Sequence, residues 1–125
     1  MNAGQRLWGL RGAAQAKRND PESILAATRE LIGGLIERNA LDPESFVSVI
    51  FTCTEDLDAE FPAVAARELG LDQVPLLCNR EIDVPGAMER VIRVLAHVYA
   101  AADHEPVHLY VGETQKLRAD LHSAQ

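Results

Sequence analysis

The sequence predicts an α/β (α+β) fold, a mixed sheet with packed helices, within a single domain of 125 residues. Three observations favour this fold: β-branched apolar runs typical of strands, long stretches with helical spacing of apolar residues, and turn signals between them. Hydrophobic residues make up 47% of the chain and charged residues 25%, which is the mix of a folded domain rather than of a disordered segment.

The first half of the chain predicts a strand, a helix and a second strand. Residues 8–16 have no helical period and contain two glycines, as in a strand with close backbone neighbours. An N-capping Asp20, followed by proline and glutamate, begins an amphipathic helix over 21–39, which we expect to lie on a sheet. After a turn at 42–44, the nearly continuous apolar run 46–53 predicts a buried central strand.

The second half predicts two more helices and two more strands. Residues 61–69 predict a short helix ended by Gly70, and residues 74–78 a short strand. The proline and glycine at 85–86 then precede a predicted second long helix. Its apolar side would consist of Met88, Val91, Ile92, Leu95, Val98 and Tyr99. Residues 107–111 alternate as in a half-buried strand with one polar face, and 113–125 are expected to form a mobile tail.

Charge and composition exclude several classes of protein. A net charge of −7 argues against nucleic-acid binding, which needs a basic face. All basic residues except Lys17 and Lys116 are arginines, which favours either a local anion site or merely a codon bias. Two cysteines make no disulfide framework, residues 1–11 show no apolar leader, and no apolar run could span a membrane. We therefore expect a cytoplasmic protein.

Common catalytic motifs are missing from the chain, and we predict neither a metal site nor a cofactor. There is no phosphate-binding loop, dinucleotide fingerprint or CxxC pair. His104 and His108 are four residues apart, but Pro106 between them prevents a shared helical face. Cys53 and Cys78 are candidate nucleophiles, although no histidine is paired with either, and Cys53 reads as a small buried residue.

Polar residues after the strand ending at Cys78 form the best candidate site, because α/β sheets place ligands at such strand ends. Asp83 has a structural use as the cap of the predicted second helix, whereas Glu81 has none. Arg93 lies beside the apolar stripe of that helix, so it could pair with Glu89, extend along the surface to water, or point at a ligand. The residues alone indicate an α/β domain with a possible anion site.

Four segments carry a more specific signal and span residues 7–121 in order. They are WGLRGA at 8–13, DLDAEFPAVAAREL at 56–69, VPLLCNREIDVPG at 74–86 with Ile92-Arg93-Val94, and HLY at 108–110 with Arg118 beyond it. Each is weak alone, but together they resemble the monofunctional chorismate mutases of the AroH class.

The resemblance implies an assembly, an activity and a set of site residues. The family forms a homotrimer with a pseudo-α/β-barrel and sites between subunits, and it converts chorismate to prephenate on the route to phenylalanine and tyrosine. The implied substrate-binding residues are Arg11, Phe61, Arg67, Cys78, Glu81, Arg93, Tyr110 and Arg118, of which Arg93, Glu81, Arg11 and Cys78 would be catalytic. Two residues depart from the family: Val64 stands where relatives can carry a rim lysine, and Ala119 replaces a common proline.

The implied reaction suits a chain without proton-transfer motifs. In an intramolecular rearrangement a C–O bond breaks as a C–C bond forms, so the enzyme must hold a flexible dianion and stabilise charge on the ether oxygen. By the resemblance, Arg93 would supply that charge, Arg11 and Tyr110 would bind a carboxylate, and Arg67 and Arg118 would guard the entrance. Two alternatives remain: a non-catalytic small-anion-binding trimer on the same scaffold, and a thiol-dependent enzyme using Cys78.

Overall fold

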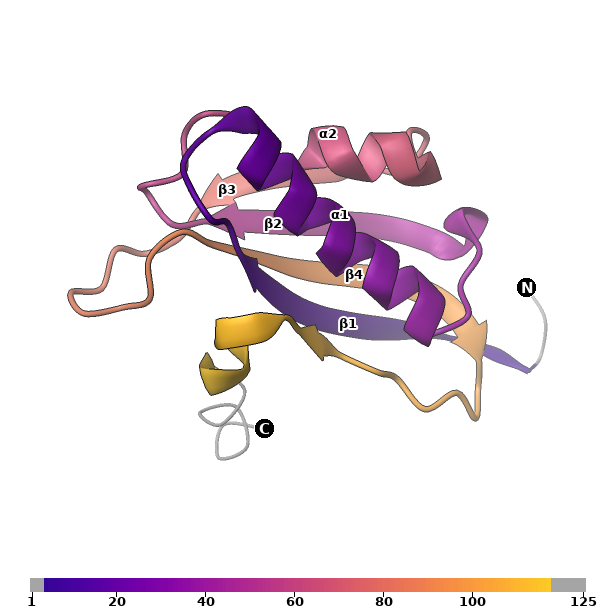
Figure 1. Ribbon diagram of the computed structural model, residues 1–125. Coiled ribbons are helices and arrows are strands. Elements are labelled where there is room, and N and C mark those ends of the chain that lie inside the picture. Colours follow the sequence, from indigo (N-terminus) through magenta and orange to yellow (C-terminus); the bar gives the residue numbers. More distant parts are fainter. Residues whose placement is uncertain (1–3, 118–125) are drawn as a thin grey trace.

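The computed structural model describes residues 4–117 and consists of a sheet with helices on one of its faces (Figure 1). The five strands lie in the order β3-β2-β4-β1-β5. Strand β4 runs antiparallel to β1 and β2, whereas β2 pairs with β3 and β1 with β5 in parallel, which confirms the predicted mixed sheet. The strands are β1 (Gln5–Gln15), β2 (Phe46–Cys53), β3 (Leu76–Arg80), β4 (Val91–Ala101) and β5 (Leu109–Tyr110).

Helix α1 (Pro21–Arg38) forms as predicted, ending within one residue of the expected position. Asp20 caps it by accepting a hydrogen bond of 2.7 Å from the Ser23 backbone N–H, and this bond holds the pKa of Asp20 below its usual value. One face of the helix is buried against the sheet, and each large apolar side chain there contributes about 1.5–3 kcal/mol. The buried residues are Ile24, Ala27, Thr28, Leu31, Ile32 and Leu35.

A second, shorter helical segment lies beside α1 on the same face of the sheet (Figure 1). It consists of α2 (Ala63–Ala66) and a π-helical turn, η2 (Arg67–Leu71), so the predicted helix at 61–69 is confirmed with shifted ends. Gly70 ends the regular helical geometry at φ +98°, a left-handed conformation that favours glycine. Strand β3 then begins two residues later than predicted.

The segment after the proline and glycine at 85–86 is strand β4, so the predicted second long helix is wrong. Apolar residues occupy both faces of β4, since Leu95 and Tyr99 lie on the face away from the helices, and such a run fits a helical spacing as well as an alternating one. Long pairing with β1 and β2 decides for the strand, and the β-branched residues fit that state. The helix-facing residues Ile92, Val94, Ala96 and Val98 are all buried.

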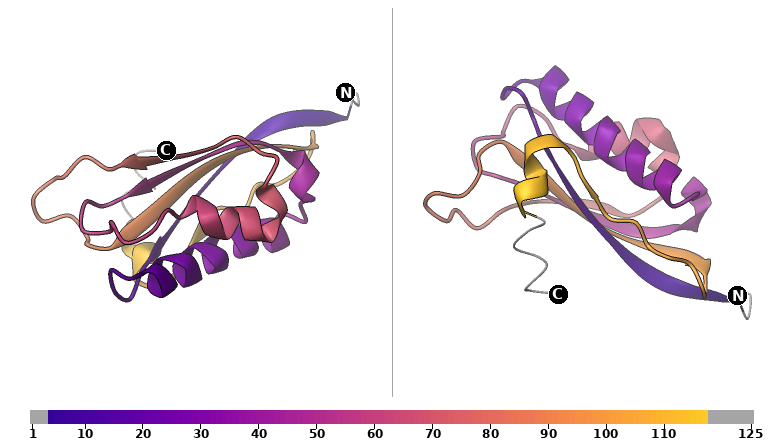
Figure 2. Two further views of the ribbon diagram at one scale, coloured as in Figure 1. Left: turned by 90° about the horizontal axis from the view of Figure 1, so that it is seen from above. Right: turned by 60° about the horizontal axis from the view of Figure 1, so that its bottom comes forward.

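Residues 81–90 form a loop that projects beyond the strand ends (Figures 1 and 2). Because no helix follows it, the predicted capping role of Asp83 is also wrong. The loop is fastened instead at its far end, where the Asp56 carboxylate accepts hydrogen bonds of 2.9 and 3.2 Å from the Arg90 backbone N–H.

Leu109 of strand β5 packs closely against two glycines, Gly12 in β1 and Gly34 in α1. A Cβ at Gly12 would lie 2.4 Å from the Leu109 carbonyl oxygen, so this position has no room for a side chain. A Cβ at Gly34 would lie 2.3 Å from Leu109 Cδ2, the end of a side chain that would have to move. The predicted strand at 107–111 is present as Leu109–Tyr110, but both residues are buried, so the expected polar face is absent at Tyr110. Beyond it, Thr114 is buried, and its hydroxyl can donate a hydrogen bond to either of two carbonyl oxygens, that of Ala13 at 3.0 Å or that of Val111 at 2.7 Å.

The two faces of the sheet differ in what covers them. Helices α1 and α2 lie on one side in the view from above, and neither of them covers the other face, which we call the open face (Figure 2, left). Near Ala13 and Tyr110 the open face is covered by Met88 and Leu117. The open face exposes the apolar side chains of Leu7, Leu77, Leu95 and Tyr99.

Of the predicted tail, residues 113–117 are described, while 118–125, including Arg118 and Ala119, lie outside the described residues. No helix within residues 4–117 is long and apolar enough to cross a membrane.

Candidate active site

Strand register brings polar residues from four strands into one row on the open face. Thr52 of β2 pairs with Asn79 of β3 and with Arg93 of β4, and Arg93 pairs in turn with Ala13 of β1. Ala13 is the partner of Tyr110 in β5. Arg93 therefore lies near the middle of a row that runs across the whole sheet.

An ion pair with Glu81 fixes the Arg93 side chain. Arg93 Nε contacts Glu81 Oε1, and the Thr52 hydroxyl donates a hydrogen bond of 3.0 Å to the same carboxylate oxygen. The Glu81 side chain is 16% exposed and that of Arg93 39%, so the guanidinium is held from below and open to a ligand above. The alternative pairing of Arg93 with Glu89 is wrong, because it assumed a helix where β4 lies.

Arg11 and Tyr110 approach the same region from the other side of β4. Arg11 pairs with Leu95, two residues along β4 from Arg93, and its backbone N–H donates a hydrogen bond of 3.0 Å to His108 Nδ1. Tyr110 is 7% exposed and packs with Ala13 and Val91 in a small apolar cluster. Arg11, Glu81, Arg93 and Tyr110 thus share the open face.

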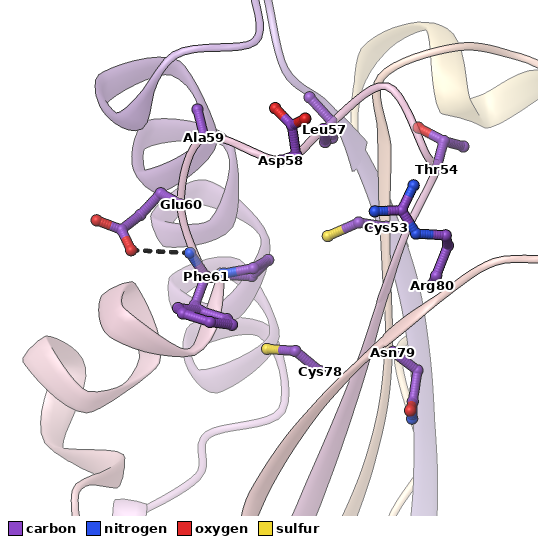
Figure 3. Close-up of a pocket in the computed structure, with 11 residues that line it drawn as sticks. Cys53, Thr54, Leu57, Asp58, Ala59, Glu60, Phe61, Cys78, Asn79 and Arg80 are labelled. Carbon is purple, nitrogen blue, oxygen red and sulfur yellow. Dashed lines mark hydrogen bonds between the residues drawn. The ribbon is translucent and has the colours of Figure 1, made fainter.

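Three other predicted site residues lie on the helix-covered side of the sheet. Cys78 and Phe61 line a pocket of about 330 Å³ between β3 and the segment leading into α2, and both side chains point into it in Figure 3. Phe61 is 66% exposed, so its ring forms an open wall of the pocket. Arg67, in the π-helical turn, is exposed and close enough to Cys78 to act on it electrostatically.

Burial keeps both thiols protonated. Desolvation raises the pKa of Cys53 to about 12, with Cys78 and Glu81 adding to the effect. Desolvation also raises the pKa of Cys78, against opposing effects of a hydrogen bond from Ala63 and the charge of Arg67. A protonated thiol is a weak nucleophile, so these environments speak against thiol catalysis at Cys78.

The seven described site residues therefore form two groups on opposite faces of the sheet. Four lie on the open face and three on the helix-covered side, and the eighth, Arg118, lies outside the described residues. Sequence reasoning missed Thr52, which orients Glu81; its place next to the buried Phe51 in an alternating strand is the signal that could have revealed it. In the described part of the chain no three histidine, cysteine or acidic side chains are grouped so as to hold a metal ion.

Comparisons with known proteins agree on one family. The sequence profile described as Chorismate mutase type I matches residues 7–121. The chain belongs to this family. Its resemblance to the AroH class, first indicated by the four segments, is confirmed by this match together with two relatives named Chorismate mutase AroH.

Individual chorismate mutases are similar over nearly their whole length. The protein named Chorismate mutase AroH from Thermus thermophilus is 48% identical over 94% of this chain and 98% of its own. The protein of the same name from Bacillus subtilis is 39% identical over 90% of this chain and 91% of its own. The structure titled Chorismate mutase from Clostridium thermocellum superposes with a TM-score of 0.80 at 38% identity, covering 87% of this chain and 98% of that one. The fold is therefore that of a chorismate mutase.

Proposed function

We propose that the protein is a chorismate mutase, an isomerase that converts chorismate to prephenate in the biosynthesis of phenylalanine and tyrosine. Membership of the family and the names of its relatives support the activity. The structural observation that carries the proposal is the Arg93 guanidinium, fixed by Glu81 and half open on the sheet. The non-catalytic alternative finds no support among these relatives, which are named as mutases.

Arg93 would act on the bond that breaks. Negative charge grows on the ether oxygen as the C–O bond lengthens, and a permanently charged group already in position stabilises it without moving a proton. Glu81 and Thr52 hold the guanidinium, so little reorganisation would be needed during the reaction. The rearrangement itself is intramolecular and asks no side chain to act as a base or nucleophile.

The remaining site residues would hold the substrate in its compact, reactive shape. Arg11 and Tyr110 would bind one carboxylate on the open face, and the Phe61 side chain would pack against the ring of the substrate. Cys78, protonated because burial raises its pKa, would help Glu81 to orient the ring hydroxyl. Arg67 and Arg118 would attract the dianion at the entrance.

We also propose that the protein forms a homotrimer with its sites between subunits, as the family resemblance implies. Two features of the chain support this assembly. The site residues fall on two opposite faces, which one chain alone does not close around a ligand. The open face also exposes Leu7, Leu77, Leu95 and Tyr99, a surface suited to contact with another copy.

The activity is tested by mixing the purified protein with chorismate and following the loss of its absorbance, with prephenate identified as the product. Conversion that saturates with substrate and disappears after denaturation supports the proposal. A folded protein that leaves chorismate unchanged would contradict it.

The shared site is tested by subunit complementation. Arg93→Gln damages the open-face group, and Phe61→Asp places a carboxylate in the helix-side pocket, where it would repel the dianion. Each variant alone should be nearly inactive, but mixed oligomers should recover activity because some sites then receive neither change. Absence of recovery after demonstrated subunit exchange would show that each site comes from one chain. Light scattering gives the mass of the assembly.

The cytoplasm is the compartment that we propose for this enzyme. Both Cys53 and Cys78 are free thiols, as is typical of proteins in a reducing environment.

A further inference from the structure

The side chains that line the pocket beside Phe61 and Cys78 carry more negative than positive charges. Its lining includes two carboxylates, Asp58 and Glu60, and one cation, Arg80. The carboxylates already have partners: Asp58 accepts a hydrogen bond of 2.8 Å from the Asn19 side chain, and Glu60 one of 2.8 Å from the Phe61 backbone N–H. Both acids therefore stabilise the loop, and Arg80 is the cation in the lining.

Arg80 is held in place by a backbone carbonyl rather than by a direct ion pair. Its Nη1 donates a hydrogen bond of 3.0 Å to the Glu55 carbonyl oxygen, and within residues 4–117 no carboxylate lies within ion-pair distance of it. The hydrogen bond occupies one of the five N–H donors of the guanidinium and leaves the rest to a ligand. In Figure 3 the guanidinium extends from β3 toward Thr54 and Cys53 at the side of the pocket.

Strand geometry separates Arg80 from its neighbour Glu81. Arg80 pairs with Cys53, and Cys78 lies two residues earlier on the same strand, so Cys78 and Arg80 share the helix-covered face. Asn79 points to the opposite face, where Glu81 joins Arg93. The short segment 78–81 thus supplies both groups of site residues, and Arg80 belongs with Phe61 and Cys78.

We propose that Arg80 is a further substrate-binding residue, whose guanidinium takes a carboxylate of the dianionic substrate in the pocket lined by Phe61 and Cys78. The inference rests on the proposed function and assigns that pocket a binding group of its own. A dianion entering a lining with two carboxylates needs a cation that faces it, and Arg80 is already pinned at the side of the pocket. Its planar fork matches a carboxylate in two hydrogen bonds.

The test is the kinetics of Arg80→Gln and Arg80→Lys with chorismate as substrate. Because Arg80 binds the substrate and does not face the breaking bond, Arg80→Gln should raise KM about tenfold and leave kcat within about twofold. Arg80→Lys keeps the charge without the fork and should fall between Arg80→Gln and the unchanged protein. Inhibition by the dianionic product prephenate should weaken by the same factor as KM rises, which measures binding apart from chemistry.

Arg18→Gln is the matched control, since it removes the same charge from a side chain that is 77% exposed and does not line the pocket of Phe61 and Cys78. Its KM should stay unchanged at equal ionic strength. The inference is overturned if Arg80→Gln keeps KM and prephenate inhibition within twofold, or if Arg18→Gln changes them equally. If the unaltered protein does not consume chorismate, the proposed function itself fails, and this outcome is distinct from an active enzyme that is indifferent to Arg80.

Discussion

Replacing Asn39 by alanine tests how the chain holds strand β5 and, with it, Tyr110. Asn39 is 3% exposed at the end of α1 and binds the segment before β5 on both sides of its amide. Its Nδ2 donates to Val107 O (2.9 Å) and Leu35 O (3.0 Å), and its Oδ1 accepts from Val107 N (2.8 Å) and from His104 Nε2 (3.0 Å). The side chain therefore acts as a strand partner for Val107.

The magnitude follows from these bonds. Asn39→Ala removes three hydrogen bonds to residues 104–107, each worth about 1 kcal/mol, so we expect a loss of about 3 kcal/mol in the free energy of unfolding. For a domain of this size the melting temperature should fall by about 10 °C. KM for chorismate should rise as well, because Tyr110 lies three residues beyond Val107.

Thermal unfolding at fixed protein concentration is the assay, since a change of assembly also moves the melting temperature. Gln73→Ala, at an exposed amide with one long hydrogen bond of 3.4 Å, is the control and should change little. Asn39→Asp keeps the acceptor but loses the donor, so it should be about as harmful as alanine at neutral pH. A melting temperature within about 2 °C of the original for Asn39→Ala would refute the reasoning.

Three further predictions concern the glycines and the thiols. Gly12→Ala should cost about 2 kcal/mol or more in urea unfolding because its Cβ would meet the Leu109 backbone, whereas Gly34→Ala should cost less because it meets only the end of the Leu109 side chain; equal costs would contradict this. The folded state keeps the Cys53 proton up to a pKa of about 12 while the unfolded chain loses it near 9.0, so stability should fall as pH rises through this window. Cys53→Ala should flatten that fall in melting temperatures measured upward from about pH 8, and an unchanged slope would count against the burial argument. Cys78→Ser should lower kcat less than about tenfold, and abolished turnover would point to thiol chemistry instead.

The sequence predicted correctly those helices and strands whose ends carry a local signal, such as a capping residue or a change from apolar to polar residues. Asp20 and the following proline predicted the start of α1, and the apolar run 46–53 predicted β2 with its correct ends. Strand β4 could not be obtained in this way, because its apolar residues serve two faces and its pairing partners lie far away in sequence. The same error gave Arg93 the wrong candidate partner, Glu89.

The face of the sheet on which each site residue lies depends on the alternation of side chains along the strands. The family resemblance supplied the residues but not their faces. Because the sequence predicted that the strand ended at Cys78, it gave no reason to place Cys78 and Glu81 on opposite sides of the sheet. Extending β3 to Arg80 makes the alternation plain, and it separates the residues that line the pocket from those that hold Arg93.

The turnover of Arg93→Gln most directly tests whether a fixed positive charge carries the catalysis. Glutamine retains hydrogen-bonding capacity near Glu81 but removes the charge that would face the ether oxygen. We predict that kcat falls by about 10²–10³ or more while KM changes much less, with Arg93→Lys also strongly impaired. A folded Arg93→Gln enzyme that keeps kcat within about tenfold of the original would contradict the account.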